Sequence, residues 1–352
     1  MTIYPIEDTG RWLGARKPLW LLLSGFAALL LAEIVYAAGS GFLEIPFAEV
    51  LRILLAPLGA GGAGESPGEM APVVVVDVRL PRILTAALVG GGLAVSGAVF
   101  QGILLNPLAD PYTLGVSAGA AFGAALALLA NVTLLGAWSV PVLAFAGAVA
   151  TLLAVIWLAG LDGDFSSSGL ILSGIIVAAI LSAGVSFIKY LADEQVGIII
   201  FWLMGSFASK GWSDVGLTAL AVGLGTALFF FFGRDLNLLA LGSRSAGSLG
   251  VSPRKMALIL LVGASLVAAV CVAVSGIIGF VGLLVPHMVR FITGPDNRRL
   301  IPVSLLAGAC LLLGADTVTR AVLPQEIPIG VITALIGGPF FCVIYRRRIK
   351  QK

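Results

Sequence analysis

Two arginines, Arg79 and Arg82, bracket a Leu-Pro pair at the start of a long apolar segment, and Arg320 follows another such segment. A guanidinium group can hold a carboxylate through two parallel hydrogen bonds, so arginines fixed at helix ends can dock an acidic partner with defined geometry. We expect all three at the outer face of a membrane, where water screens their charge. Their alternative role is to anchor helix ends at the interface, as long basic side chains commonly do.

Two short polar turns lie at the ends of other apolar segments. One contains Asn106, Pro107 and Leu108 and continues to Asp110-Pro111, and the other is the triplet Ser166, Ser167 and Ser168. Proline interrupts a helix, and a serine before an apolar run is a favoured N-cap. The serines therefore predict the start of a helix after residue 168.

The elements that position these residues are long and apolar. Hydrophobic residues make up 59% of the 352 positions and charged residues 11%, whereas a soluble domain carries about 25% charged residues. Apolar stretches of roughly 20 residues span a bilayer. We predict one all-α, polytopic membrane domain over residues 1–352 with about ten transmembrane helices. The predicted spans are 18–38, 82–105, 113–130, 139–160, 169–191, 212–233, 255–276, 277–293, 300–318 and 327–345.

The basic residues are distributed unequally between the two sides of the membrane. If the N-terminus is inside, fifteen of the 21 lysines and arginines lie on the cytoplasmic side, which leaves six outside. Basic residues favour the cytoplasmic side, so we expect both termini in the cytoplasm.

An internal sequence match and a regular glycine spacing make predictions about how the helices are arranged and packed. Residues 94–107 and 273–286 match at seven of fourteen positions without gaps, and five predicted spans separate them. An odd number of spans would invert the second copy, so an inverted internal repeat is expected. Gly115, Gly119 and Gly123 are spaced four apart, which favours close helix packing over ligand binding.

The sequence gives little support to phosphate binding, ion coupling or metal binding by this chain. The chain has no GxxxxGK[ST] phosphate-binding loop, and its spans hold almost no ionisable residues, although Glu33 lies toward the outer end of the first. Ion-coupled carriers usually place such groups mid-membrane, so energy is expected to come from a separate ATPase. Cys271, Cys310 and Cys342 lack CxxC spacing, and the lone His287 is interpreted as a packing residue, so no metal site is expected.

Three further motifs, at residues 275–290, 314–320 and 326–341, occur in order after the RLPR and NPLADP segments. Together the five closely resemble the FecCD permease family of ABC importers, which take up iron–siderophore complexes, haem and vitamin B12. The resemblance covers roughly residues 18–346. One departure is Leu105, where many members carry a charged residue.

The resemblance implies partners and a location. It implies a homodimer, or a pair with a paralogue, in the cytoplasmic (inner) membrane of a bacterium or archaeon. Two ATPase subunits would carry ATP and Mg, and an extracytoplasmic substrate-binding protein would deliver cargo. No cofactor on this chain and no nucleic acid are expected. An ion-gradient-driven secondary transporter is the alternative function.

The resemblance also assigns roles to residues. Arg79, Arg82 and Arg320 would meet glutamates on two lobes of the binding protein. The turns 106–108 and 166–168 would form a cytoplasmic gate. Residues 235–250 resemble the coupling loop that contacts the ATPase, in which an apolar knob fits a groove; the alternative is a solvated connecting loop. Its expected coupling residues are Leu238, Leu239, Leu241, Gly242, Ala246, Leu249 and Gly250.

Overall fold

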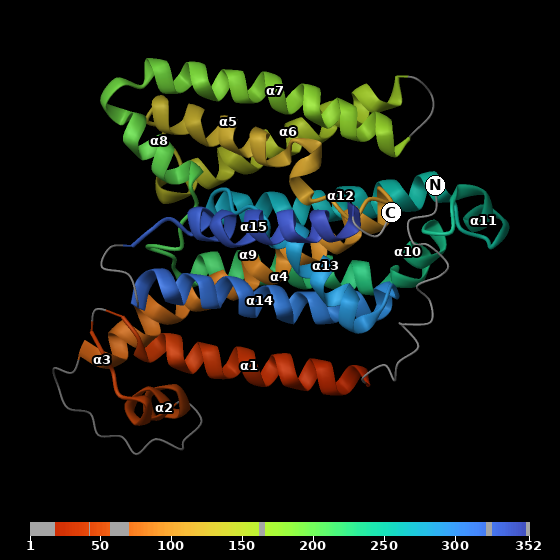
Figure 1. Ribbon diagram of the computed structural model, residues 1–352. Helices are drawn as coiled ribbons and strands as arrows, with labels where there is room; N and C mark the ends of the chain where they lie inside the picture. The colour runs from red at the N-terminus through yellow and green to blue at the C-terminus, as the bar shows by residue number, and fades with distance from the viewer. Residues whose placement is uncertain (1–17, 42, 57–69, 162–165, 322–325, 350–352) are drawn as a thin grey trace.

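The computed structural model describes residues 18–41, 43–56, 70–161, 166–321 and 326–349, and every regular element within these ranges is helical (Figure 1). Several basic residues behind the predicted orientation fall outside these ranges: Arg11, Arg16, Lys17, Lys350 and Lys352. The all-α fold expected from the apolar segments is confirmed for the described chain.

Ten described helices correspond to the predicted spans. They are α1 (Leu19–Gly39), α4 (Leu80–Ile103), α5 (Val116–Leu129), α6 (Ser139–Gly160), α7 (Ser167–Leu191), α9 (Trp212–Phe231), α12 (Pro253–Ser275), α13 (Val281–Thr293), α14 (Asn297–Ala321) and α15 (Ile329–Ile349). Seven membrane-length apolar helices occur among the described residues, whereas α5, α13 and the apolar part of α15 are shorter. The number of helices that cross the membrane completely is therefore only approximately ten.

Shorter elements connect these helices. They are α2 (Phe47–Leu55), α3 (Met70–Val73), the π-helical turn η3 (Val74–Arg79), the 3₁₀ turns η4 (Pro111–Leu114), η5 (Gly136–Trp138) and η6 (Asp193–Gln195), and the helices α8 (Val196–Leu203), α10 (Gly233–Leu239) and α11 (Ser243–Ser248). In Figure 1, α2 and α3 lie at one end of the bundle, and α10 and α11 lie at the opposite end. The two ends thus carry different short helices.

Helix α4 is the centre of the bundle and is buried along most of its length, packed against α9, α12, α13 and α14. Glycines let these backbones approach closely. A Cβ added to Gly97 would lie 1.8 Å from the Gly282 carbonyl oxygen, and one on Gly90 would lie 2.2 Å from that of Gly308. Between helices in lipid, small residues give the close contacts that drive packing.

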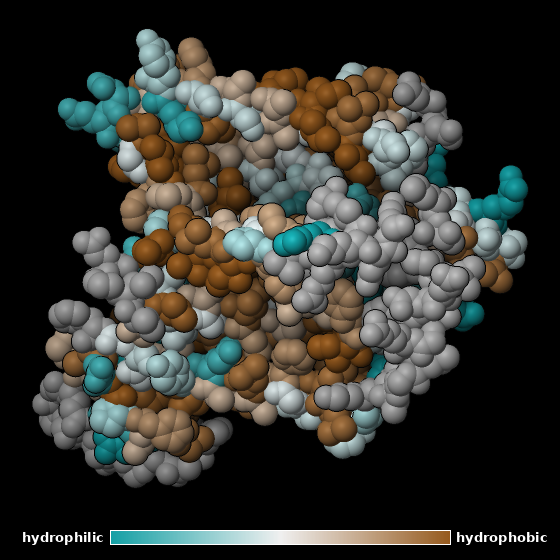
Figure 2. Space-filling model, in the orientation of Figure 1, coloured by the Kyte–Doolittle hydropathy of each residue, from teal (hydrophilic) through white to brown (hydrophobic). Residues whose placement is uncertain are grey.

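The predicted glycine face is a packing surface. A Cβ on Gly119 would lie 2.4 Å from the Gly147 carbonyl oxygen, and one on Gly123 would lie 2.1 Å from that of Leu143. Helices α5 and α6 therefore touch along Gly119 and Gly123, which confirms the packing interpretation for these two, whereas Gly115 precedes α5 and has a φ of 75°. Outward surfaces are apolar as well, as Figure 2 shows, and on α7 the side chains of Ile175 and Ile180 are exposed.

The two matching segments, residues 94–107 and 273–286, differ in structure. Residues 94–103 continue the helix α4, whereas the matching stretch includes residues 276–280, which are non-helical between α12 and α13. Gly276 and Phe280 both have positive φ values, at 75° and 67°. The gapless match therefore aligns a helix with a helix break, and it gives no support to an inverted repeat at these residues.

Two helix breaks meet the start of α15. The Ser206 N–H donates to the Ser275 carbonyl oxygen at 2.8 Å, and the N–H groups of Ile329 and Gly330 donate to the carbonyl oxygens of Gly205 and Met204 at 3.2 and 3.0 Å. Non-helical backbone among membrane helices needs such partners, because lipid offers none. We call residues 204–206, 275–278 and 329–330 the backbone junction.

Candidate functional site

Two of the predicted docking arginines hold the end of α1. Arg79 donates to the Ala38 carbonyl oxygen at 2.6 Å and also to that of Leu43. Arg320 donates to the carbonyl oxygens of Ser40 at 2.6 Å and Ala37 at 2.7 Å. The last carbonyls of a helix lack intrahelical partners and carry its negative dipole end, so two guanidinium groups are favourable there. We call Arg79 and Arg320 the arginine clamp.

Arg82 instead pairs with two carboxylates. Its Nη2 and Nε donate to Asp316 at 2.9 and 3.0 Å, a bidentate arrangement with α14. Its Nη1 donates to the two carboxylate oxygens of Glu326 at 3.0 and 3.2 Å. The Asp316 side chain is 1% exposed and that of Glu326 is 53% exposed. Arg82 therefore joins a buried and an exposed carboxylate.

The expected exposure of these arginines is wrong. Arg79 is only 7% exposed and belongs to the buried polar residues, and all three side chains have partners within the chain. Arg79 and Arg320 thus hold the end of α1, whereas docking and anchoring at the membrane interface both stay predictions. The sequence motifs contain Asp316 and Glu326, but no local spacing indicates that both reach Arg82 from more than 200 positions away.

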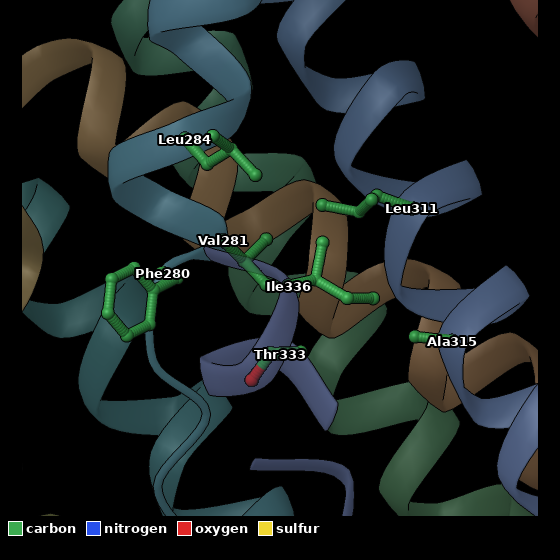
Figure 3. A pocket seen from close by; sticks show the side chains of 7 residues that line it. All are labelled: Phe280, Val281, Leu284, Leu311, Ala315, Thr333 and Ile336. Atoms are coloured by element: carbon green, nitrogen blue, oxygen red, sulfur yellow. The ribbon is translucent and has the colours of Figure 1, made fainter. Parts of the chain in front are cut away.

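A small apolar pocket lies between α13, α14 and α15 (Figure 3). Its lining residues come from the starts of α13 and α15 and from the middle of α14: Phe280, Val281, Leu284, Leu311, Ala315, Thr333 and Ile336. The Thr333 hydroxyl donates to the Gly330 carbonyl oxygen at 3.1 Å. No charged side chain lines this pocket, so its chemistry suits apolar contact and not metal coordination.

The predicted gate turns are ordered by local hydrogen bonds. The Asn106 side-chain oxygen accepts from the Leu108 N–H at 3.0 Å, and Asp110 forms a capping box with Thr113. The Ser166 hydroxyl accepts from the Gly169 N–H at 3.0 Å, which confirms the N-cap of α7. Residues 162–165 lie outside the described ranges. Closure of a pathway by these turns stays a prediction.

The predicted coupling segment is a pair of short helices, α10 and α11, separated at Gly242 as expected. The residues expected to form the apolar knob differ in their exposure. Leu239 is 9% exposed and Ala246 is buried, whereas Leu241 is 62% exposed and Leu249 is also exposed. The exposed leucines are therefore the side chains that a partner can reach.

Asn237 fixes α10 against the loop before α14. Its side chain donates to Asp296 at 2.7 Å and accepts from the Asn297 N–H and side-chain amide at 2.9 and 2.8 Å. A force on the exposed leucines would thus be transmitted to α14. Gly242 and Gly250 have φ values of 93° and 87°, a backbone region that favours glycine.

His287 and the cysteines show no ligand geometry. The His287 ring packs edge-on against Phe291 with centroids 5.1 Å apart, which agrees with a packing role. Cys271 and Cys310 are buried and Cys342 is exposed, each as a free thiol. Across the described ranges, no cluster of three or more His, Cys, Asp or Glu residues has the arrangement of a metal site.

Comparison with known proteins agrees with this arrangement. Residues 29–347 match the FecCD transport family. The cobalamin import system permease protein BtuC of Halobacterium salinarum is 44% identical, over 80% of this chain and 75% of its own. The molybdate import system permease protein MolB of Haemophilus influenzae is 39% identical, over 92% and 94%.

A solved structure extends the likeness to the fold. It is described as an inward-facing conformation of a putative metal-chelate type ABC transporter, and it matches with a TM-score of 0.79 and 34% identity over 94% of this chain and 99% of that one. The sequence match, the shared fold and the membrane-length helices agree along nearly the whole chain. The chain therefore belongs to the FecCD transport family, as a membrane-spanning permease of the ABC importer type.

Proposed function

We propose that this permease imports a metal chelate as a homodimer, with two ATPase subunits below it and one substrate-binding protein above it. ATP and Mg belong to the ATPase subunits, and the permease itself carries out no chemical step. The relatives support import as the direction of transport, and the 94% overlap with a metal-chelate type transporter supports the class of cargo.

The exposed leucines beside α10 and α11 are the observation that carries ATP coupling. Leu241 lies in the turn between the two helices and Leu249 directly follows α11, and these helices lie at the end of the bundle opposite α2 and α3 (Figure 1). Large apolar side chains in water indicate a partner surface. A cytoplasmic ATPase is the partner that an ABC permease needs, so this end faces the cytoplasm and both termini lie there. The arginine clamp then lies at the outer end.

Transport by the reconstituted complex tests the proposal. Proteoliposomes would contain the permease and its ATPase, with the binding protein outside and ATP inside, and uptake of cobalamin, a ferric siderophore, haem and molybdate would be compared. We expect uptake of one metal chelate only with both ATP and binding protein. Uptake driven by a proton or sodium gradient without ATP would instead establish the secondary transporter.

A further inference from the structure

Arg82 has two carboxylate partners with opposite surroundings. Asp316 holds the Nε and Nη2 edge from within the bundle, and its side chain is 1% exposed. Glu326 holds Nη1 from the surface, and its side chain is 53% exposed. The buried pair is fixed by packing, whereas the Glu326 carboxylate can leave for water at little cost.

The clamp arginines offer no comparable exchange. Arg79 and Arg320 donate to carbonyl oxygens of the chain at the end of α1, and releasing them would leave those acceptors without their partners. An incoming carboxylate can replace Glu326 on Arg82 with no loss of hydrogen bonds, because one carboxylate substitutes for another at the same N–H groups. Among the three arginines, Arg82 Nη1 is thus the donor whose carboxylate partner can be exchanged.

We propose that Glu326 acts as a placeholder, occupying the position on Arg82 that a carboxylate of the binding protein takes when it docks. The inference rests on the proposed function, in which a substrate-binding protein meets this end of the permease. Glu326 keeps the guanidinium paired while the permease is unoccupied and lowers the affinity for the docked partner. A moderate affinity lets the emptied binding protein leave.

The strength of exposed ion pairs sets the expected change in the dissociation constant. Exposed ion pairs contribute about 0.2–1 kcal/mol, which corresponds to about 1.4- to 5-fold in a dissociation constant. Removing the Glu326 charge should therefore tighten docking by about 1.4- to 5-fold at low ionic strength. The gain should shrink as salt screens the exposed groups.

The experiment measures binding of the purified binding protein to the whole permease–ATPase complex in nanodiscs at low and physiological salt. Glu326→Gln keeps the shape of the side chain and leaves the Arg82–Asp316 pair intact. Glu194→Gln is the matched control, because Glu194 is an exposed residue after α7, at the same end of the bundle but in another region (Figure 1). We expect tighter binding with Glu326→Gln and unchanged binding with Glu194→Gln.

A second background separates the placeholder from docking itself. Arg82→Gln combined with Asp316→Asn removes the arginine without leaving a buried carboxylate unpaired. This pair of changes should weaken binding, and adding Glu326→Gln to it should give no gain, since coupled residues are not additive.

Each alternative result has one meaning. Unchanged or weaker binding with Glu326→Gln, or an equal gain with Glu194→Gln, overturns the placeholder. Unchanged binding in the Arg82→Gln, Asp316→Asn background overturns docking at Arg82, and the placeholder with it. ATP-driven uptake in the proteoliposome assay would still stand in either case.

Discussion

Gly97 has no room for a side chain, because its α-carbon faces the backbone of α13. Gly97→Ala would place a methyl group 1.8 Å from the Gly282 carbonyl oxygen, and backbone atoms cannot move aside as a flexible side chain can. We expect a loss of about 1–3 kcal/mol in stability from overpacking. Thermal unfolding in detergent measures it, with Gly223→Ala in α9 as the control, because no atom lies within 4 Å of the Cβ there. Equal melting temperatures for both variants would contradict the close contact.

The burial of the clamp arginines leads to a different prediction for stability from the one that exposed positions would give. As exposed docking residues, they could be reversed in charge without loss of stability. In the structure, Arg79→Glu would set a carboxylate against the carbonyl oxygens of Ala38 and Leu43. We expect a loss on the order of 3 kcal/mol, because charged hydrogen bonds are removed and acceptors are left buried.

The measurement is again thermal unfolding of the purified permease. Lys189→Glu near the end of α7 is the control, since it reverses the same charge at a partly exposed position of the same end of the bundle. A melting temperature that falls no further with Arg79→Glu than with Lys189→Glu would leave the clamp without a structural role.

The chemistry of these residues could be predicted from the sequence, but their partners could not. The Arg-Leu-Pro-Arg spacing predicts two guanidinium groups at a helix start, but helical structure runs from Met70 through η3 into α4, so Arg79 and Arg82 lie within it. Their acceptors are the end of α1 and the carboxylate of Asp316, which is 234 positions from Arg82. Such contacts depend on which helices are neighbours, and the composition of a single helix carries no information on this.

At the scale of elements, the coupling pair α10–α11 divides its leucines between core and surface. Leu241→Asp should abolish transport and the stimulation of ATPase activity while the permease remains folded, because this side chain is exposed. Leu239→Asp should instead lower the yield of folded permease, because it buries an unpaired carboxylate at a cost of several kcal/mol. The two changes therefore differ because Leu239 is buried and Leu241 is exposed.

Size-exclusion chromatography shows which variants still fold, and the ATPase assay then measures stimulation in those that do. Full stimulation in a folded Leu241→Asp complex would remove this loop from the mechanism. Leu249→Asp, at the other exposed leucine of the segment, should behave like Leu241→Asp, whereas Ala246→Asp should behave like Leu239→Asp, since Ala246 is buried.

Apolar length predicts the long helices well and the breaks poorly. Predicted span 139–160 coincides with α6, and predicted span 169–191 starts two residues late, because Ser166 and not Ser168 caps α7. The segment 277–293 is not one continuous helix, since residues 276–280 are non-helical. Within this break the Ile278 carbonyl oxygen accepts from the Tyr112 hydroxyl at 2.8 Å. Phe280 adopts a positive φ although it is not a glycine, so the sequence gives no sign of the break there.

At the scale of the whole molecule, alternating access predicts that the gate turns change their exposure with nucleotide state. Cysteines at Leu108 and Ser168, both exposed, report on it. The background replaces Cys342, which is exposed, as well as the buried Cys271 and Cys310. We expect the labelling rates with a membrane-impermeant maleimide to differ between the ATP-trapped and nucleotide-free complexes.

A cysteine at Leu134 is the control, because it is 91% exposed between α5 and α6, away from both turns. Its labelling should be the same in all states. If Leu108→Cys and Ser168→Cys also label equally throughout the cycle, the gate lies elsewhere in the bundle.

The backbone junction also constrains how the protein is made. Residues 204–206 are synthesised well before residues 275 and 329–330, which provide their hydrogen-bond partners. Unsatisfied amide and carbonyl groups are costly in hydrocarbon, so the growing chain must keep this segment shielded by water or by the insertion machinery. Biogenesis is therefore completed only when α15 arrives. A nascent chain that stops before residue 329 leaves the carbonyl oxygens of Met204 and Gly205 without these donors.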